Sequence, residues 1–393
     1  MSFKHSSSCI LSLYNLLAWS LNTTMVVSGW STKWINLNLP TQIQPPRSGH
    51  VAFHTQNKVY VFGGYAEETP ESRYPINDVW CFDQEKWTCV QPPFAETPQA
   101  RLAAAAAVTC ADEGGEVGVV IGGWDSQQAG SGGIILNDVQ AFSGKSNAWK
   151  TILPLDNEQL QPTSRSCAIA LPDDRILLHN HRCLDYVLIF DVKEIKWEKK
   201  RVTGTPPSSR GLHACVILPD NKKIVLFGGA AQNGLMSNEV FVLDTTTWEW
   251  TKPTLCSDSS EDEDAVPSPR ASPCFIALDD NTCFLYGGAS VKQEGGLHGN
   301  NDVWLLELKN RDSSSSQIKA KWTQLHKDGD ANSPPGRNAA TLTQLFSCPS
   351  SLLEEDDDEE GALYFLLSGG WYPFRTTYND DFVLKVTPPS SSS

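Results

Sequence analysis

The chain has 393 residues and a formal net charge of −15 at pH 7. This acidic balance, without a basic stripe, argues against nucleic acid and anionic membranes as partners. The 11 cysteines show neither disulfide-like spacing nor a CxxC pair, so we expect no disulfide framework and no zinc or redox site.

Residues 1–29 form a leader outside the expected globular fold. Lys4 precedes a mostly apolar stretch, residues 9–21, which is the pattern of a signal peptide. Ser12 and Asn15 interrupt that stretch, so we expect a disordered segment and a cytoplasmic protein. The alternative is the secretory pathway, if residues 1–28 act as a signal.

A repeated pattern begins with Arg47. Its first copy predicts four strands, at residues 50–55, 59–62 and 78–82 and from Trp87 onward. Gly63-Gly64 ends the second strand, where the backbone needs a positive φ or a close approach to another backbone.

The order of Arg, Gly-Gly, Asn-Asp-Val and Trp recurs with a period of roughly 50 residues. The arginines that open the six copies are Arg47, Arg101, Arg165, Arg210, Arg270 and Arg337. The third copy is degenerate, with His179-Asn180-His181 in place of Gly-Gly, and the sixth copy ends after its third strand. This grammar resembles that of the kelch-repeat family over about residues 30–390.

The resemblance implies an all-β fold, a six-bladed kelch-type β-propeller with four antiparallel strands per blade. We expect the propeller at residues 30–388 and a Ser-rich tail at 389–393. The alanine run 103–107 alone favours a helix, but it lies where every copy has its first strand. The last copy lacks an outer strand, so Trp34–Leu37 should complete that blade and close the ring.

The six arginines share one register and should ring one mouth of the central channel. Guanidinium groups there can hold carboxylates in bidentate fashion. The resemblance implies that arginines at this position contact acidic or C-terminal peptides. The alternative is structural: each arginine pairs with the Asp or Glu of an Asn-Asp-Val motif in its own or a neighbouring blade.

The loops after Gly-Gly should open on the same face as the arginines. Three of them begin with an aromatic residue, Tyr65, Trp124 or Trp371. Aromatic and arginine side chains at a concave mouth are typical of binding hot spots, and the alternative is that the rings cap the blade edges. The loop of the third copy is nearly absent, so the mouth should be low on that side.

Two acidic runs, residues 258–264 and 354–360, interrupt the repeats and are expected to be solvated loops. The first should lie on the arginine face as a weak internal competitor for the ligand. Ser259-Ser260, followed by acidic residues, also resembles the site of an acidophilic kinase.

Catalysis finds little support in the sequence. His179 and His181 alternate along a strand and could share a face for a metal, but a degenerate turn explains them better. No phosphate loop or Ser-His-Asp pattern emerges. We therefore expect no catalytic residue, no metal and no cofactor.

The sequence thus predicts a monomeric protein–protein interaction module, not an enzyme, that binds an acidic or C-terminal peptide of a partner at the channel mouth. The resemblance adds the roles of adaptor and ubiquitin-ligase substrate receptor. The alternatives are a metal-dependent kelch enzyme and a secreted or lumenal glycan-binding propeller.

Overall fold

The computed structural model describes residues 25–27, 29–39, 44–69, 72–91, 97–110, 115–127, 131–152, 160–256, 266–309, 317–346 and 361–389. Strands, turns and loops make up this part of the chain, and it contains no helix long and apolar enough to cross a membrane. The acidic runs 258–264 and 354–360, Ser259-Ser260 and residues 1–24 lie outside the described residues, as do residues 390–393 of the predicted tail.

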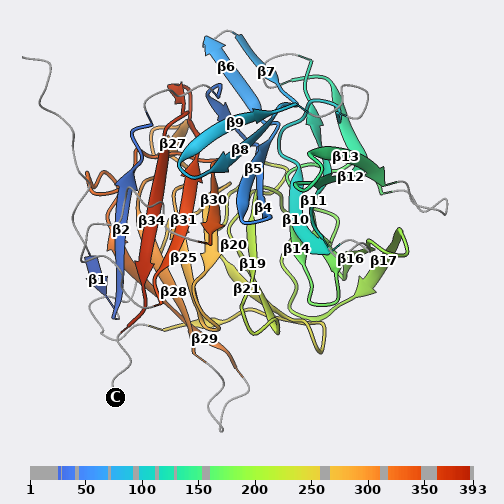
Figure 1. Ribbon diagram of the computed structural model, residues 1–393. Coiled ribbons are helices and arrows are strands. Elements are labelled where there is room, and N and C mark those ends of the chain that lie inside the picture. The colour runs from blue at the N-terminus through green and yellow to red at the C-terminus, as the bar shows by residue number, and fades with distance from the viewer. Residues whose placement is uncertain are drawn as a thin grey trace, which may run out of the picture.

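Six antiparallel sheets stand around one axis as the blades of a β-propeller (Figure 1). The first blade comprises β4 (Val51–Thr55), β5 (Lys58–Phe62), β8 (Val79–Asp83) and β9 (Lys86–Val90). The second comprises β10 (Ala105–Cys110), β11 (Glu116–Asp125), β12 (Ile134–Ser143) and β13 (Ala148–Ile152). The third comprises β14 (Cys167–Ala170), β15 (Arg175–His179), β16 (Tyr186–Asp191) and β17 (Lys196–Arg201).

Short parallel strands flank the next two blades. The fourth blade comprises β19 (Ala214–Ile217), β20 (Lys223–Phe227), β21 (Val240–Asp244) and β22 (Glu249–Thr251), with β18 (Thr203–Gly204) at its edge. The fifth comprises β24 (Cys274–Ala277), β25 (Thr282–Tyr286), β28 (Val303–Lys309) and β29 (Lys319–His326), with β23 (Thr254–Leu255) at its edge. The sixth comprises β30 (Thr341–Leu345), β31 (Leu363–Ser368) and β34 (Asp381–Thr387), completed by β2 (Trp30–Asn36) and β1 (Met25–Val27).

Small hairpins extend three of the loops that follow Gly-Gly. They are β6 (Tyr65–Thr69) with β7 (Ser72–Pro75), β26 (Ala289–Val291) with β27 (Leu297–Gly299), and β32 (Trp371–Tyr372) with β33 (Thr376–Thr377). A two-residue strand, β3 (Arg47–Ser48), pairs with β6. The predicted six-bladed propeller with four antiparallel strands per blade is confirmed.

The second part of the alanine run, Ala105 to Ala107, begins the strand β10 that the repeat predicts, whereas Ala103 and Ala104 precede it. Ala105 pairs with Ile121 across β10 and β11. Ala105 and Ala107 are buried in a cluster that also contains Ala168 and Ala170 of the third blade. First strands converge toward the axis, so small side chains let neighbouring blades approach, and this packing overrides the helix propensity of alanine.

The N-terminal strand closes the propeller. β2 pairs with β34, with Trp34 opposite Leu384, and Figure 1 shows the blue N-terminal strand beside the red C-terminal one. The closure prediction is confirmed, although β2 starts at Trp30, four residues earlier than expected. β1 adds a further strand outside β2, within the segment 1–29 that we expected to lie outside the fold.

The core lies between blades rather than within them. Each hydrophobic cluster joins residues from two adjacent sheets, and the cluster around Trp34 joins the fifth and sixth blades. The Trp34 ring is 1% exposed and lies 5.1 Å from the ring of Tyr286, centroid to centroid. The outer strand of the last blade therefore carries a large part of the packing between blades.

Replacing Trp34 by Ala should destabilise the whole propeller. The change removes a buried aromatic side chain from the closing strand, a loss of about 3–5 kcal/mol in the free energy of unfolding. Thr88→Ala, an exposed change on the outer strand β9, is the control and should stay within about 0.5 kcal/mol. Urea unfolding followed by circular dichroism measures both, and equal midpoints for the two variants would contradict the closing role of Trp34.

Candidate functional site

The starts of the first strands and the loops after the second strands lie at one end of the propeller. The registers establish this, because Val51 at the start of β4 pairs with Phe62 at the end of β5. In five blades a bridge also ties the loop to the segment before the first strand, as between Leu102 and Trp124. We call this end the mouth.

Six backbone hydrogen bonds form a closed ring at the mouth. In each blade one residue before the first strand has a φ between 49° and 63°, and its N–H donates to the carbonyl of its counterpart in the preceding blade over 2.7–3.1 Å. We call these residues the inner ring: Gly49, Ala103, Arg165, Leu212, Ser272 and Ala339. Five of the six are not glycine, and each such left-handed residue costs about 1–2 kcal/mol.

Five of the six predicted arginines lie two residues before the inner ring and are buried in ion pairs. Arg270 is representative: its Nη1 donates to the Gly287 carbonyl at 2.9 Å, and its two terminal nitrogens lie 2.6 and 2.7 Å from the Asp302 carboxylate oxygens. The pairs, each within one blade, are Arg47–Asp78, Arg101–Asp138, Arg210–Glu239, Arg270–Asp302 and Arg337–Asp380. The prediction that these five arginines face a ligand is therefore wrong, because each exposes 3% or less of its surface.

Two of the acidic partners, Glu239 and Asp138, have lowered pKa values. Burial raises the pKa of Glu239, but hydrogen bonds from Lys252 and Arg210 outweigh it and lower the pKa to about 2. The same balance, with Arg101 as the partner, lowers the pKa of Asp138. Five of the six predicted arginines are thus paired with an acid of their own blade, and Arg165 is the remaining one.

Arg165 occupies a different place from the other five. The residue in the buried position is Thr163, whose carbonyl accepts the Gly123 N–H at 2.9 Å, as the Arg101 carbonyl accepts the Gly64 N–H at 2.8 Å. Arg165 stands two residues later, in the inner ring, with an exposed side chain. Its guanidinium carbon is 5.9 Å from the Trp124 ring centroid, and no carboxylate of the described residues pairs with it. Arg165 is the one charged member of the inner ring.

The three predicted aromatic residues also differ in burial. Tyr65 is buried, 4% exposed, so its prediction as a ligand contact is wrong. The guanidinium of Arg73 covers it, 4.9 Å from the Tyr65 centroid and 4.8 Å from that of Trp371. Trp371 and Trp124 are half-buried. Arg73, which the sequence analysis did not single out, thus joins the first and sixth blades at the mouth.

An apolar rim surrounds the mouth. Seven large hydrophobic side chains are 40–78% exposed, with at least one from every blade; they lie on the loops after the second strands or, for Ile134 and Ile135, at the start of β12. They are Tyr74, Ile134, Ile135, Leu184, Leu235, Val291 and Phe374. Sequence reasoning missed them because isolated hydrophobic residues in loops carry no periodicity.

The third blade has the short loop that the sequence predicted, residues 180–185 between β15 and β16. A cavity of about 370 Å³ on this blade extends from Asn180, Arg182 and Tyr186 along the outer strand β17, where Trp197, Glu198 and Lys199 line it. Arg182 Nη1 donates to the carbonyl of Pro162, three residues before Arg165, at 3.2 Å. Two cations, Arg165 and Arg182, therefore stand on the same blade.

The predicted histidine pair separates in the structure. His179 is buried and lies 3.0 Å from His213, Nδ1 to Nε2, whereas His181 is half-buried in the turn that follows. Burial, with Arg210 nearby, lowers the pKa of His179 to about 3, so its ring is neutral. Cys167 and Cys215 lie beside His213, and a hydrogen bond from the Cys215 thiol lowers the pKa of Cys167.

A family model matches most of the chain. The model of the KLHDC2/KLHL20/DRC7 Kelch-repeats domain matches residues 14–180 and 177–347. The chain belongs to the kelch-repeat family. In this chain the buried arginine–acid pair, the Gly-Gly turn and the buried Trp of the outer strand are structural parts of a blade, which explains why they recur.

Relatives span several kinds of kelch protein. Kelch domain-containing protein 2 of Bos taurus is 24% identical over 282 residues, covering 63% of this chain and 64% of the relative. Adagio-like protein 1 of Oryza sativa subsp. japonica is 24% identical over 312 residues, covering 74% of this chain and 46% of the relative. Host cell factor of Drosophila melanogaster is 25% identical over 199 residues, covering 49% of this chain and 12% of the relative. This kelch chain thus matches less than half the length of the rice and fly relatives.

A solved structure shares the fold. The structure of YjhT superimposes with a TM-score of 0.56 at 16% identity, covering 87% of this chain and 95% of that one. At this identity the likeness concerns the propeller alone. That the kelch chain is not an enzyme stays a prediction.

Removing one acid of the buried pairs should destabilise the propeller. Asp302→Ala leaves the guanidinium of Arg270 buried without its carboxylate, a loss of about 3–5 kcal/mol in the free energy of unfolding. Arg165→Ala is the matched arginine control, since Ala103 and Ala339 already occupy the same inner-ring position, and it should change stability by about 0.5 kcal/mol or less. Thermal melts compare the stability of the two variants. A larger loss of stability for Arg165→Ala than for Asp302→Ala would contradict the conclusion that the Arg270–Asp302 pair is structural and Arg165 is not.

Proposed function

We propose that this protein is a protein-interaction module whose mouth binds an acidic segment or the free C-terminus of a partner protein, with Arg165 as the anchor. The observation that carries the proposal is the contrast among the arginines. Five are buried and neutralised by their own blade, whereas Arg165 is exposed in the inner ring and pairs with no carboxylate of the described residues. An exposed guanidinium binds a carboxylate through two parallel hydrogen bonds.

The apolar rim supports a partner with hydrophobic side chains beside its carboxylate. Exposed apolar patches rimmed by polar groups are typical of interaction surfaces. An arginine among hydrophobic and aromatic side chains is also the composition of binding hot spots. One accessible anchor suits a single carboxylate, such as a chain terminus, better than a long acidic run.

The third blade, with its short loop, gives the bound segment a path. The cavity beside Arg182 lies on the same blade as Arg165, so a peptide held at Arg165 can leave the mouth over the third blade. Arg182 and Lys199 in the cavity wall are accompanied by the carboxylate of Glu198, so this cavity offers the peptide polar contacts of both signs.

Membership in the kelch-repeat family supports the general role in protein interaction. Its use as a monomeric adaptor or as a ubiquitin-ligase substrate receptor is part of the same proposal, as is a cytoplasmic location. The nine described cysteines carry free thiols, which is typical of proteins in a reducing compartment.

A peptide library with free or amidated C-termini tests the anchor. Arg165→Ala should weaken binding of the selected free-carboxylate peptides about 10-fold or more, a loss of about 1.4 kcal/mol or more, because it removes the guanidinium that meets the carboxylate. Amidation should weaken binding to the unaltered protein by a similar factor and should have little further effect on Arg165→Ala. Fluorescence anisotropy at low and high salt gives the dissociation constants.

Lys196→Ala provides the matched control. Lys196 is an exposed cation on the same blade, opposite Asp191 at the far end of β16 and β17 from the mouth. Its removal should leave peptide binding unchanged. If Arg165→Ala binds the selected peptides as tightly as Lys196→Ala does, the carboxylate-anchor proposal fails and the apolar rim becomes the recognition surface.

A further inference from the structure

The seam between the third and fourth blades differs from the other five seams. In those five, a glycine N–H of one blade donates to the carbonyl of the residue two positions before the next blade's inner-ring residue, over 2.8–2.9 Å. The pairs are Gly64–Arg101, Gly123–Thr163, Gly229–Arg270, Gly288–Arg337 and Gly370–Arg47. At the remaining seam His181 stands in the glycine position, and within residues 160–256, all of which are described, no such bond joins it to Arg210.

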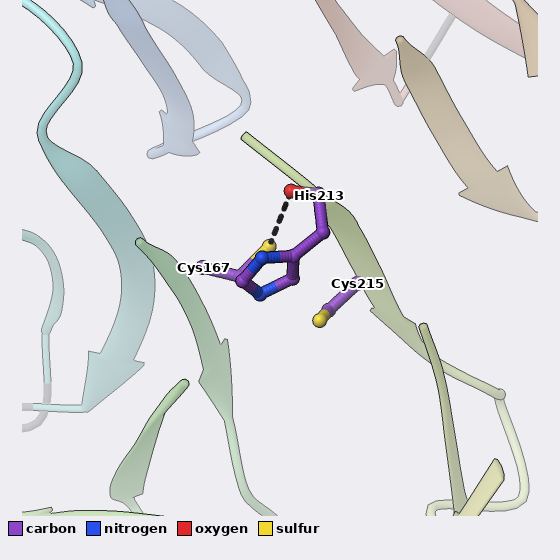
Figure 2. A group of neighbouring side chains, drawn as sticks. All are labelled: Cys167, His213 and Cys215. Carbon is purple, nitrogen blue, oxygen red and sulfur yellow. Dashed lines mark hydrogen bonds between the residues drawn. The ribbon is translucent and has the colours of Figure 1, made fainter. Parts of the chain in front are cut away.

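Three soft donor side chains meet at this seam. The ligand atoms of Cys167, His213 and Cys215 all lie within 4.8 Å of one another, and Figure 2 shows Cys167 of β14 beside His213, the residue before β19, and Cys215 of β19. His213 and Cys215 are two residues apart in an extended segment, so both side chains lie on the side that meets Cys167 of the third blade. The Cys167 sulfur already lies 3.7 Å from the His213 carbonyl oxygen.

The other seams place no such set at the same positions. Two residues after the inner ring, where Cys167 stands, the other blades have Val51, Ala105, Ala214, Cys274 and Thr341. Facing them, at the positions of His213 and Cys215, are the pairs Ala104 and Ala106, Ser166 and Ala168, Pro273 and Phe275, Ala340 and Leu342, and His50 and Ala52. Cys274 and His50 stand at two different seams, so only the seam between the third and fourth blades combines two sulfurs and an imidazole at these positions.

The His213 ring is oriented like that of a metal ligand. Its Nε2 lies 3.0 Å from Nδ1 of His179, while its Nδ1 has no hydrogen-bond partner although the residue is only 6% exposed. A ligating histidine characteristically uses its second ring nitrogen to donate to an acceptor that fixes its tautomer. With His179 as that acceptor, the lone pair of His213 Nδ1 is left for an ion.

We propose that Cys167, Cys215 and Nδ1 of His213 bind one Zn²⁺ ion that ties the third blade to the fourth. Two thiolates and an imidazole are donors that zinc prefers, and three protein ligands leave the fourth tetrahedral position to water or a ligand. Zn–S bonds of about 2.3 Å place two sulfurs about 3.8 Å apart at a tetrahedral centre, so small side-chain rotations complete the site. Both cysteine residues are half-buried. On binding, each thiol loses its proton to solvent.

The test compares matched cysteine variants of the full chain. Reduced, chelator-treated protein is incubated with Zn²⁺ alone, passed through a desalting column and analysed for metal; Co²⁺ replaces Zn²⁺ in a parallel absorption titration. We expect one Zn²⁺ per chain, a thiolate–Co²⁺ charge-transfer band and a higher melting temperature with metal. Cys215→Ala and Cys167→Ser should lose all three, and Cys274→Ala should keep them, because Cys274 has the register of Cys167 but faces Ala340 and Leu342.

His179 is a positioning residue in this site. His179→Ala should weaken Zn²⁺ affinity about 10- to 100-fold while the charge-transfer band survives at saturating Co²⁺, because both sulfurs remain. Circular dichroism confirms folding of each variant, and Cys167→Ser serves where Cys215→Ala does not fold. The proposal is overturned if zinc stays well below one per chain in reduced protein, if Cys215→Ala and Cys274→Ala bind it equally, or if the reduced chain re-forms a Cys167–Cys215 disulfide and takes up no metal.

Discussion

The inner ring of backbone hydrogen bonds sets the geometry on which the rest of the propeller depends. Each left-handed residue turns its N–H to the blade before it and its carbonyl to the blade after it, so six identical steps close on themselves. The conformational cost at five non-glycine positions is offset because every one of these groups is satisfied. Two residues upstream, the buried arginines attach each blade's own loops to this frame.

In this arrangement the residues that recur in every repeat are structural, and different residues are available for binding. The repeated Arg, Gly-Gly and Asp residues hold strands and blades together, and each arginine is paired with an acid inside the fold. The residues free to differ are the inner-ring side chains and the loops at the mouth. Arg165, Trp124 and the apolar rim all belong to that second group.

The strands and the closure could be read from the sequence because they rest on repeated local features. Residues 59–62, bounded by a polar turn and Gly-Gly, became β5, and the orphan strand at Trp34 had one vacant blade to fill. The register of Arg165 could not be read, since the third copy lacks the Gly-Gly that aligns the others and a shift of two residues preserves strand alternation. The inner ring carries no common residue type, so its conformation leaves no mark in the sequence.

The cluster of Cys167, His213 and Cys215 could not be predicted from the sequence for a related reason. Cys167 and His213 belong to different repeats, and only the seam brings them together. Among its described residues, the third blade has no buried arginine pair and no Gly-Gly turn, and its loop is short. The same blade holds Arg165, the cavity beside Arg182 and Cys167 of the cysteine cluster. The blade that lacks the repeated motif residues is thus the one that carries Arg165 and Cys167.

The closing strand has a consequence for how the protein is made. β2 precedes its partner β34 by about 345 residues in the chain, the distance from Asn36 to Asp381. At the usual elongation rates of about 5–20 residues per second, β2 waits roughly 20–70 s with an apolar strand face unpaired. Its alternation of Trp30, Thr32 and Trp34 with more polar neighbours invites other sheet edges during that interval. The nascent chain is therefore most vulnerable to mispairing of β2 before β34 has been synthesised.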